Sequence, residues 1–169
     1  EEILSKYYRP HHKKLERFVD EGLAENQDVL IVDCHSFPDI PFHKSIIPDS
    51  KEMRPDICIG TDSFHTSKKL TQFMEVFFKQ KGYSVSVNSP YSGSMVTSKH
   101  HRSRRKLSTI MVEVNRRLYM DERTKNKLTH NGEFQSMQDD LQQLLSGLKN
   151  FNEKKQKYDV GNIRTIWKR

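Results

Sequence analysis

This 169-residue sequence lacks several features that would place it among membrane or secreted proteins. No apolar run is long enough to span a bilayer, and no apolar segment near residue 1 is of the signal-peptide type. There are only two cysteines, Cys34 and Cys58, and no CxxC pair, so a disulfide framework is not expected. We expect both thiols to be small apolar groups in buried strands. These absences favour a cytoplasmic protein without membrane contacts.

The composition is polar, but it is not that of a disordered chain. Hydrophobic residues make up 34% and charged residues 30% of the sequence, and the hydrophobic residues are clustered. The net charge of +7 suits an enzyme that attracts an anionic substrate. A basic run at 99–106 could also contact nucleic-acid phosphates. That run has no interleaved aromatic residues, so nucleic acid is not the expected partner.

The hydrophobic pattern alternates between strand and helix periods. Strands are expected near 29–33, 56–62, 83–88 and 107–114, and helices near 11–23, 66–81 and 134–148. The helix near 66–81 carries the clearest apolar stripe, which we interpret as core packing: Leu70, Phe73, Met74, Phe77 and Phe78. The pattern predicts an α/β fold with a mixed sheet flanked by helices. It predicts one domain at 1–150, followed by a basic tail or edge strand at 151–169.

The stretch around His35 is the first candidate site. Four large apolar residues precede Asp33, and the strand they predict should end just before Pro38, which cannot continue a central ladder. A histidine at the carboxyl end of a buried strand lies where open α/β sheets place their ligands. Asp33 could orient the imidazole or shape the site floor. The alternative is that His35 is only a hydrogen-bonded structural residue.

Glu113 is the second candidate, because it interrupts an apolar strand. Ile110, Val112 and Val114 share one face of that strand, so Glu113 shares the other face with Met111. A buried carboxylate needs a partner or a function. It could be a general base whose pKa is raised by burial. The alternative is a structural salt bridge to Arg116, Arg117 or a neighbouring strand.

Tyr91 is the third candidate and lies in a turn rich in glycine and serine. Its phenol could donate a hydrogen bond to a substrate or to a developing oxyanion. It could equally be a packing residue beneath a loop. The sequence leaves these two roles open.

Four segments resemble, in order, successive motifs of the N-formylglutamate amidohydrolases. They are DCHSFP at 33–38, RPDICIGTD at 54–62, NSPYSG at 88–93 and MVEVNRRLYMDE at 111–122. The resemblance extends from about residue 8 to 148, nearly the whole chain. It implies a phosphorylase/hydrolase-like fold of the zinc carboxypeptidase type. We expect that fold to be incomplete here, because the family's N-terminal motifs are not in the sequence.

The resemblance also implies an activity and a site. The activity is that of a zinc-dependent amidohydrolase acting on N-acyl amino acids such as N-formylglutamate. His35 matches a zinc ligand, Glu113 matches the base that activates water, and Tyr91 lies in the substrate-side loop. Because the family's upstream histidine and carboxylate ligands are missing, His35 is the one Zn²⁺ ligand that can be assigned. The alternative is an inactive homologue or fragment that serves as a binding module. The expected partner is a small-molecule substrate, and the oligomeric state stays open.

Overall fold

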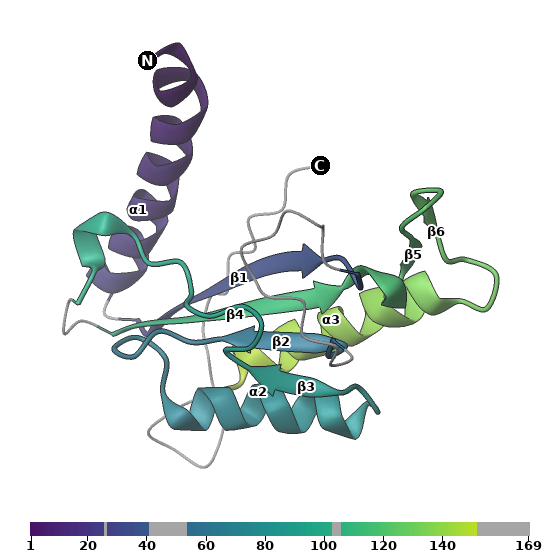
Figure 1. The fold of residues 1–169 in the computed structure, drawn as a ribbon. Coiled ribbons are helices and arrows are strands. Elements are labelled where there is room, and N and C mark those ends of the chain that lie inside the picture. The colour runs from purple at the N-terminus through teal and green to yellow at the C-terminus, as the bar shows by residue number, and fades with distance from the viewer. Residues whose placement is uncertain (26, 41–53, 103–105, 152–169) are drawn as a thin grey trace.

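The computed structural model describes residues 1–25, 27–40, 54–102 and 106–151 (Figure 1). Its helices are α1 (Arg9–Ala24), α2 (Lys68–Gln80) and α3 (Glu133–Lys149), and its strands are β1 (Val29–Phe37), β2 (Ile57–Gly60), β3 (Val85–Val87), β4 (Leu107–Asn115), β5 (Met120–Asp121) and β6 (Asn126–Lys127). A π-helical turn at Leu4–Tyr8 leads into α1, and 3-10 turns span Ser98–His100 and Arg116–Leu118. Every predicted strand and helix is present, with ends shifted by a few residues. The short β5–β6 hairpin was not predicted.

A mixed four-stranded sheet forms the centre of the molecule, with strand order β1-β4-β2-β3. β1 lies parallel to β4, whereas β2 runs antiparallel to β4 and parallel to β3. The fold is therefore the predicted α/β class with mixed strand pairing. Because β2 is reversed, its amino end lies beside the carboxyl ends of β1 and β4.

One face of the sheet builds the hydrophobic core. Alternate residues of β4, namely Ile110, Val112 and Val114, point to this face, as do Ile57 and Ile59 of β2. Helices α2 and α3 pack against them, and Figure 1 shows both helices on the same side of the sheet. Burying each such side chain stabilises the fold by roughly 1.5–3 kcal/mol.

Helix α2 shows why the sequence places it on this core. Ser67 begins the helix, and its hydroxyl accepts a hydrogen bond from the backbone N–H of Leu70 at 3.1 Å. Leu70, Met74 and Phe78 are fully buried against the sheet. The predicted apolar stripe is therefore core packing, as its spacing indicated.

Three predictions need correction or lie outside the described residues. Cys58 is buried as expected, but Cys34 is exposed although it lies beside Val112 on the core side of the sheet, because β1 is an edge strand. The basic run at 99–106, considered above as a contact for phosphates, is not exposed throughout, because His100 is buried between Thr97 and Asp20. The tail at 152–169 lies outside the described residues. No described helix has the length and apolar character needed to cross a membrane.

Candidate functional site

The opposite face of the sheet carries a row of three chemically active side chains. His35 on β1 lies directly beside Glu113 on β4, and Glu113 lies directly beside Cys58 on β2. Side chains in register on neighbouring strands point to the same face. The structure therefore brings together the imidazole and the carboxylate that the sequence singled out.

Glu113 is buried, with 8% of its surface exposed, and its Oε2 atom has no hydrogen-bond partner among the described residues. Burial raises the pKa of its carboxyl; the nearby charge of Asp33 adds to this effect, while His35 and Arg116 oppose it. A raised pKa is what a general base working near neutral pH needs.

The salt-bridge alternative for Glu113 is not found in the part of the chain that the structure describes. Arg116 donates to Ser36 and lies 3.9 Å from Glu122, and Arg117 pairs with Asp39 and Asp56. Both candidate arginines are thus held by other carboxylates. Glu113 therefore has no ion pair with either arginine in the structure's described residues.

His35 is exposed above this face and is oriented by Asp33. The two side chains share a hydrogen bond of 2.8 Å between His35 Nε2 and Asp33 Oδ1, as the predicted orienting role requires. The other ring nitrogen, Nδ1, makes no hydrogen bond to the described residues. A metal-binding histidine commonly donates its second ring nitrogen to a carboxylate in this way.

A complete metal site is not found among the described residues. They hold no cluster of three or more His, Cys, Asp or Glu side chains that could bind a metal ion. A catalytic zinc has three protein ligands and an open position. The donor chemistry of His35 and Asp33 therefore fits one zinc ligand with its orienting carboxylate, and it does not fit a full ligand set.

The loop that carries Tyr91 lies directly on β2. The thiol of Cys58 donates to the carbonyl oxygen of Tyr91 at 3.2 Å. A Cβ atom on Gly60 would lie 2.3 Å from the carbonyl oxygen of Gly93, so only glycine lets this loop approach so closely. The Tyr91 ring packs on Phe37 with ring centroids 5.4 Å apart. Tyr91 is therefore a packing residue that also lies next to Cys58, one of the three aligned side chains on this face of the sheet.

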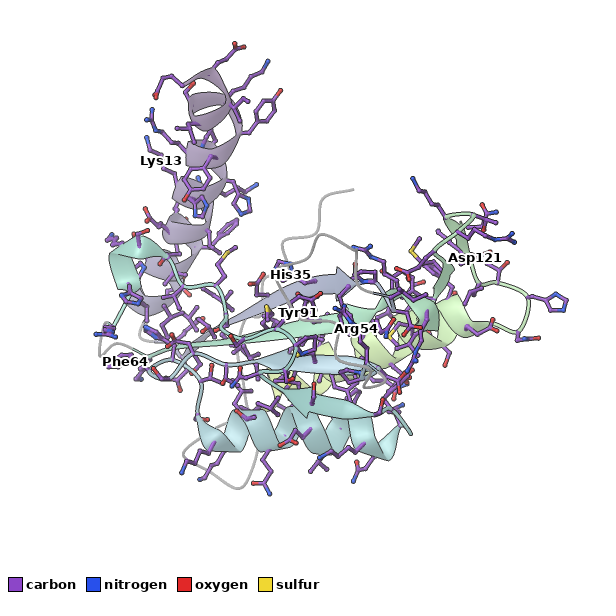
Figure 2. The ribbon with its side chains drawn as sticks, in the orientation of Figure 1. Lys13, His35, Arg54, Phe64, Tyr91 and Asp121 are labelled. Carbon is purple, nitrogen blue, oxygen red and sulfur yellow. The ribbon has the colours of Figure 1, made fainter. Side chains whose placement is uncertain are left out.

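Arg54 is a residue of this face to which we had assigned no role. One nitrogen of its guanidinium, Nη1, donates to the Pro38 carbonyl at 3.0 Å and to the Tyr91 hydroxyl at 3.2 Å. Figure 2 shows Arg54, Tyr91 and His35 on the same side of the sheet. Only the strand order could have indicated this position, because Arg54 lies in the segment that leads into β2, the strand antiparallel to β4. From sequence alone the direction of β2 was not determined.

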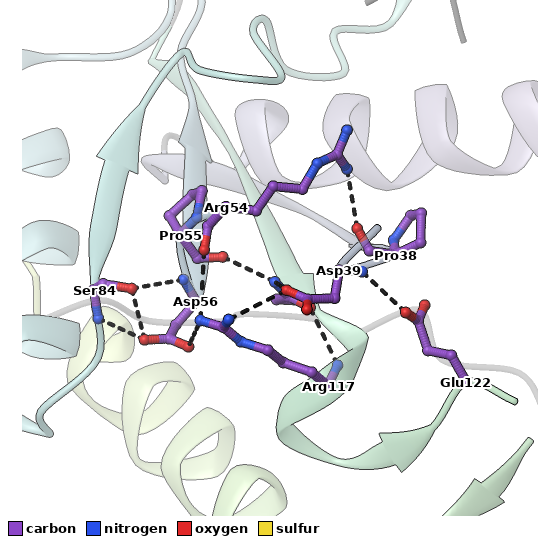
Figure 3. A network of polar contacts seen from close by, with 9 residues as sticks. Pro38, Asp39, Arg54, Pro55, Asp56, Ser84, Arg117 and Glu122 are labelled. Carbon is purple, nitrogen blue, oxygen red and sulfur yellow. Dashed lines mark hydrogen bonds and ion pairs between the residues drawn. The ribbon is translucent and has the colours of Figure 1, made fainter. Parts of the chain in front are cut away.

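A polar network holds the segment of Arg54 in place (Figure 3). Arg117 bridges Asp39 and Asp56 at 3.2 and 2.8 Å. Asp56 also accepts hydrogen bonds from the backbone N–H and hydroxyl of Ser84. Burial by itself would raise the pKa of Asp56, but the hydrogen bonds from Ser84 and Arg117 outweigh it and hold this pKa below its ordinary value. The network ties the start of β2 to the segment that follows β1.

Comparison with known proteins places these features in a family context. A family model described as N-formylglutamate amidohydrolase matches residues 1–120. The crystal structure of N-formylglutamate amidohydrolase from Ralstonia eutropha JMP134 is similar, with a TM-score of 0.71 and 27% sequence identity over 84% of this chain and 51% of that one. No curated protein matches the chain.

A second solved structure supports the fold alone. It is a gene product of Agrobacterium tumefaciens, with a TM-score of 0.57 and 22% sequence identity over 85% of this chain and 51% of that one. The chain thus spans about half the length of these two solved relatives.

Proposed function

Because the chain belongs to the N-formylglutamate amidohydrolase family, we propose that it takes part in the hydrolysis of an N-acyl amino acid. The observation that carries the proposal is the position of Glu113. It is a buried carboxyl with an oxygen that is unpartnered among the described residues, in register with His35 on a polar sheet face. The Ralstonia relative, named an N-formylglutamate amidohydrolase, supports the same reaction class.

Zinc dependence is part of this proposal. His35 would supply one ligand through Nδ1, with Asp33 holding the ring. When bound, zinc would lower the pKa of water and polarise the scissile carbonyl. The remaining ligands have to come from outside the described residues, because those residues hold no cluster of three ligating side chains.

Glu113 performs the proton transfers in this scheme. Its carboxylate takes a proton from the attacking water as the new C–O bond forms. It then delivers that proton to the amide nitrogen as the C–N bond breaks, which releases the acid and the free amino acid. Tyr91 accepts a hydrogen bond from Arg54, so its own hydroxyl hydrogen stays available to a developing oxyanion.

The test compares zinc content with turnover in the protein purified at its native length. We expect bound zinc and formate release from N-formyl-L-glutamate. His35→Ala should lose zinc, whereas Glu113→Gln should keep zinc and lose formate release by about 100-fold or more, since general-base contributions reach 10²–10⁴.

Two results would contradict the proposal. Wild-type turnover in Glu113→Gln would show that another residue is the base. Absence of both zinc and formate release from the unmodified protein would leave an inactive homologue that serves as a binding module.

A further inference from the structure

Two buried histidines hold the segment at 97–102, which follows the Tyr91 loop and precedes β4. His65 and His100 are each only 3% exposed. His65 lies between β2 and α2, and His100 is the last residue of the 3-10 turn that begins at Ser98. Neither takes part in the proposed hydrolysis. The hydrogen-bond partners of a buried imidazole decide which of its protonation states can be accommodated.

The partners of His65 fix one neutral form of its ring. Nδ1 lies 3.1 Å from the carbonyl oxygen of Leu107, which only accepts, so Nδ1 carries the proton and donates it. Nε2 lies 3.0 Å from the backbone nitrogen of Arg102, which only donates, so Nε2 accepts through its lone pair. A second proton on the ring would occupy that lone pair and set two N–H groups against each other. The contact between His65 and Arg102 therefore exists only while the ring is neutral.

The partners of His100 impose no such restriction. Its Nε2 lies 3.1 Å from Oδ1 of Asp20, and its Nδ1 lies 2.6 Å from the hydroxyl of Thr97. Hydrogen bonds from Lys99 and from His100 hold the pKa of Asp20 below its ordinary value, so this carboxylate accepts from Nε2. The Thr97 hydroxyl can donate to a neutral ring or accept from a charged one. His100 thus keeps both partners in either protonation state.

The charged groups around His65 do not replace the hydrogen bond that its protonation removes. On its own segment, Asp62 accepts from the His65 backbone N–H at 2.7 Å, and its carboxylate attracts positive charge. Among the described residues, no carboxylate is hydrogen-bonded to the ring itself. The facing segment carries His101 and Arg102, and positive charge there opposes a second proton on the ring. The partner from β4, the Leu107 carbonyl, is neutral.

We propose that His65 is a pH-sensitive contact, which holds the segment at 97–102 while its ring is neutral and releases Arg102 when the ring takes up a proton. Histidine ordinarily gains its charge between about pH 8 and 5, so the release falls within that range. The opening is local, because the bonds of His100 to Thr97 and Asp20 persist in both states. This inference does not depend on the proposed hydrolysis.

The test is amide hydrogen exchange, followed by NMR on the whole protein at about pH 7.5 and about pH 5. Protection factors correct for the intrinsic pH dependence of exchange. The Arg102 amide reports the contact, and the amide of Ile110, in the middle of β4, is the reference. We expect protection of Arg102 relative to Ile110 to fall about tenfold on acidification, the ratio that corresponds to one typical hydrogen bond.

Three variants separate His65 from the other histidines. His65→Gln offers Arg102 a carbonyl oxygen that does not titrate, so its relative protection should be the same at both pH values. His100→Gln removes the other buried ring, and His130→Gln removes an exposed one. Both should keep the response of the wild-type protein, because His65 is intact in each.

The ring nitrogen shifts of the wild-type protein test the contact without any substitution. Near the upper pH, neutral His65 should carry its proton on Nδ1. On acidification, the His65 ring shifts and the Arg102 amide shift should titrate with one midpoint. These two measurements decide the matter even if His65→Gln does not fold.

Several results would overturn the proposal. They are a neutral His65 ring protonated on Nε2, different midpoints for His65 and Arg102, and no loss of Arg102 protection in the wild-type protein. A loss that persists in His65→Gln would also do so. A loss abolished by His100→Gln alone would assign the pH response to His100 instead.

Discussion

Glu113 is a charged residue within β4, a strand whose other large side chains are mostly apolar. Its neighbours in sequence are apolar and pack into the core, but the two-residue period of β4 turns its carboxyl to the other face. Leaving a buried polar atom without a partner costs roughly 1–3 kcal/mol. Such groups cluster at functional sites, where a perturbed pKa is part of the chemistry.

Asp56 provides the residue-scale prediction for pH dependence. Its folded-state pKa is held below the ordinary 3.8, so it stabilises the fold above that pH and loses this contribution as the pH falls through the lower, folded-state value. Asp56→Asn should lower the free energy of unfolding by about 1 kcal/mol at pH 7, a figure reduced for solvent screening. The difference should shrink below about pH 5.

Denaturant titration of both proteins between pH 3 and 7 measures this effect. Asp28→Asn, at an exposed carboxylate that lies 3.9 Å from Lys106, serves as the control and should change stability little at any pH. A difference for Asp56→Asn that stays constant over this range would show that its charge does not stabilise the network.

Sequence reasoning found individual residues where the local pattern carries the information. Glu113 stood out because it is charged among apolar neighbours, and His35 because it closes an apolar run. Arg54 has no such local signal. Its place on the polar face depends on β2 running antiparallel to β4 and on the Tyr91 loop lying over β2. Those are long-range relations that one sequence does not display.

Helices and strands show the same contrast between local signals, which the sequence displays, and long-range relations, which it does not. Helix α2 could be read from its stripe and its Ser67 cap, because both signals are local. Strand order could not be read, because β2 inserts beside β4 rather than beside β1, its predecessor in the chain. The end of β1 was predicted correctly from Pro38: the strand continues through His35 to Phe37, in register with β4 along all nine residues.

Gly60 gives the element-scale prediction, because it sets how closely the Tyr91 loop approaches β2. A Cβ atom there would lie 2.3 Å from both the Gly93 carbonyl and the Met111 methyl. Gly60→Ala should therefore destabilise the protein by about 1–3 kcal/mol, as overpacked sites do. Denaturant unfolding measures the change.

Gly147→Ala is the comparison for this prediction. Its Cβ would meet only the tip of the Phe73 ring, at 3.1 Å, and alanine is favoured over glycine inside a helix by about 1 kcal/mol. We expect a net change close to zero. Equal destabilisation by both substitutions would show that the loop does not depend on Gly60.

At the scale of the whole molecule, the two faces of the sheet differ in role. One face joins α2 and α3 in the hydrophobic core, and the other carries the row of His35, Glu113 and Cys58 with the Tyr91 loop beside it. The core thus holds the proposed reacting groups, His35 and Glu113, on strands rather than on loops. The net charge of +7 is consistent with an anionic substrate.

The most direct measurement is anomalous diffraction at the zinc edge from crystals of the protein grown with zinc. We expect a peak at about 2.0–2.1 Å from Nδ1 of His35, the usual zinc–nitrogen distance, on the face that carries Glu113. His35→Ala crystals should lack that peak. A zinc peak elsewhere with none at His35, or a zinc at His35 with the Glu113 carboxylate on the opposite face, would contradict the proposed zinc site.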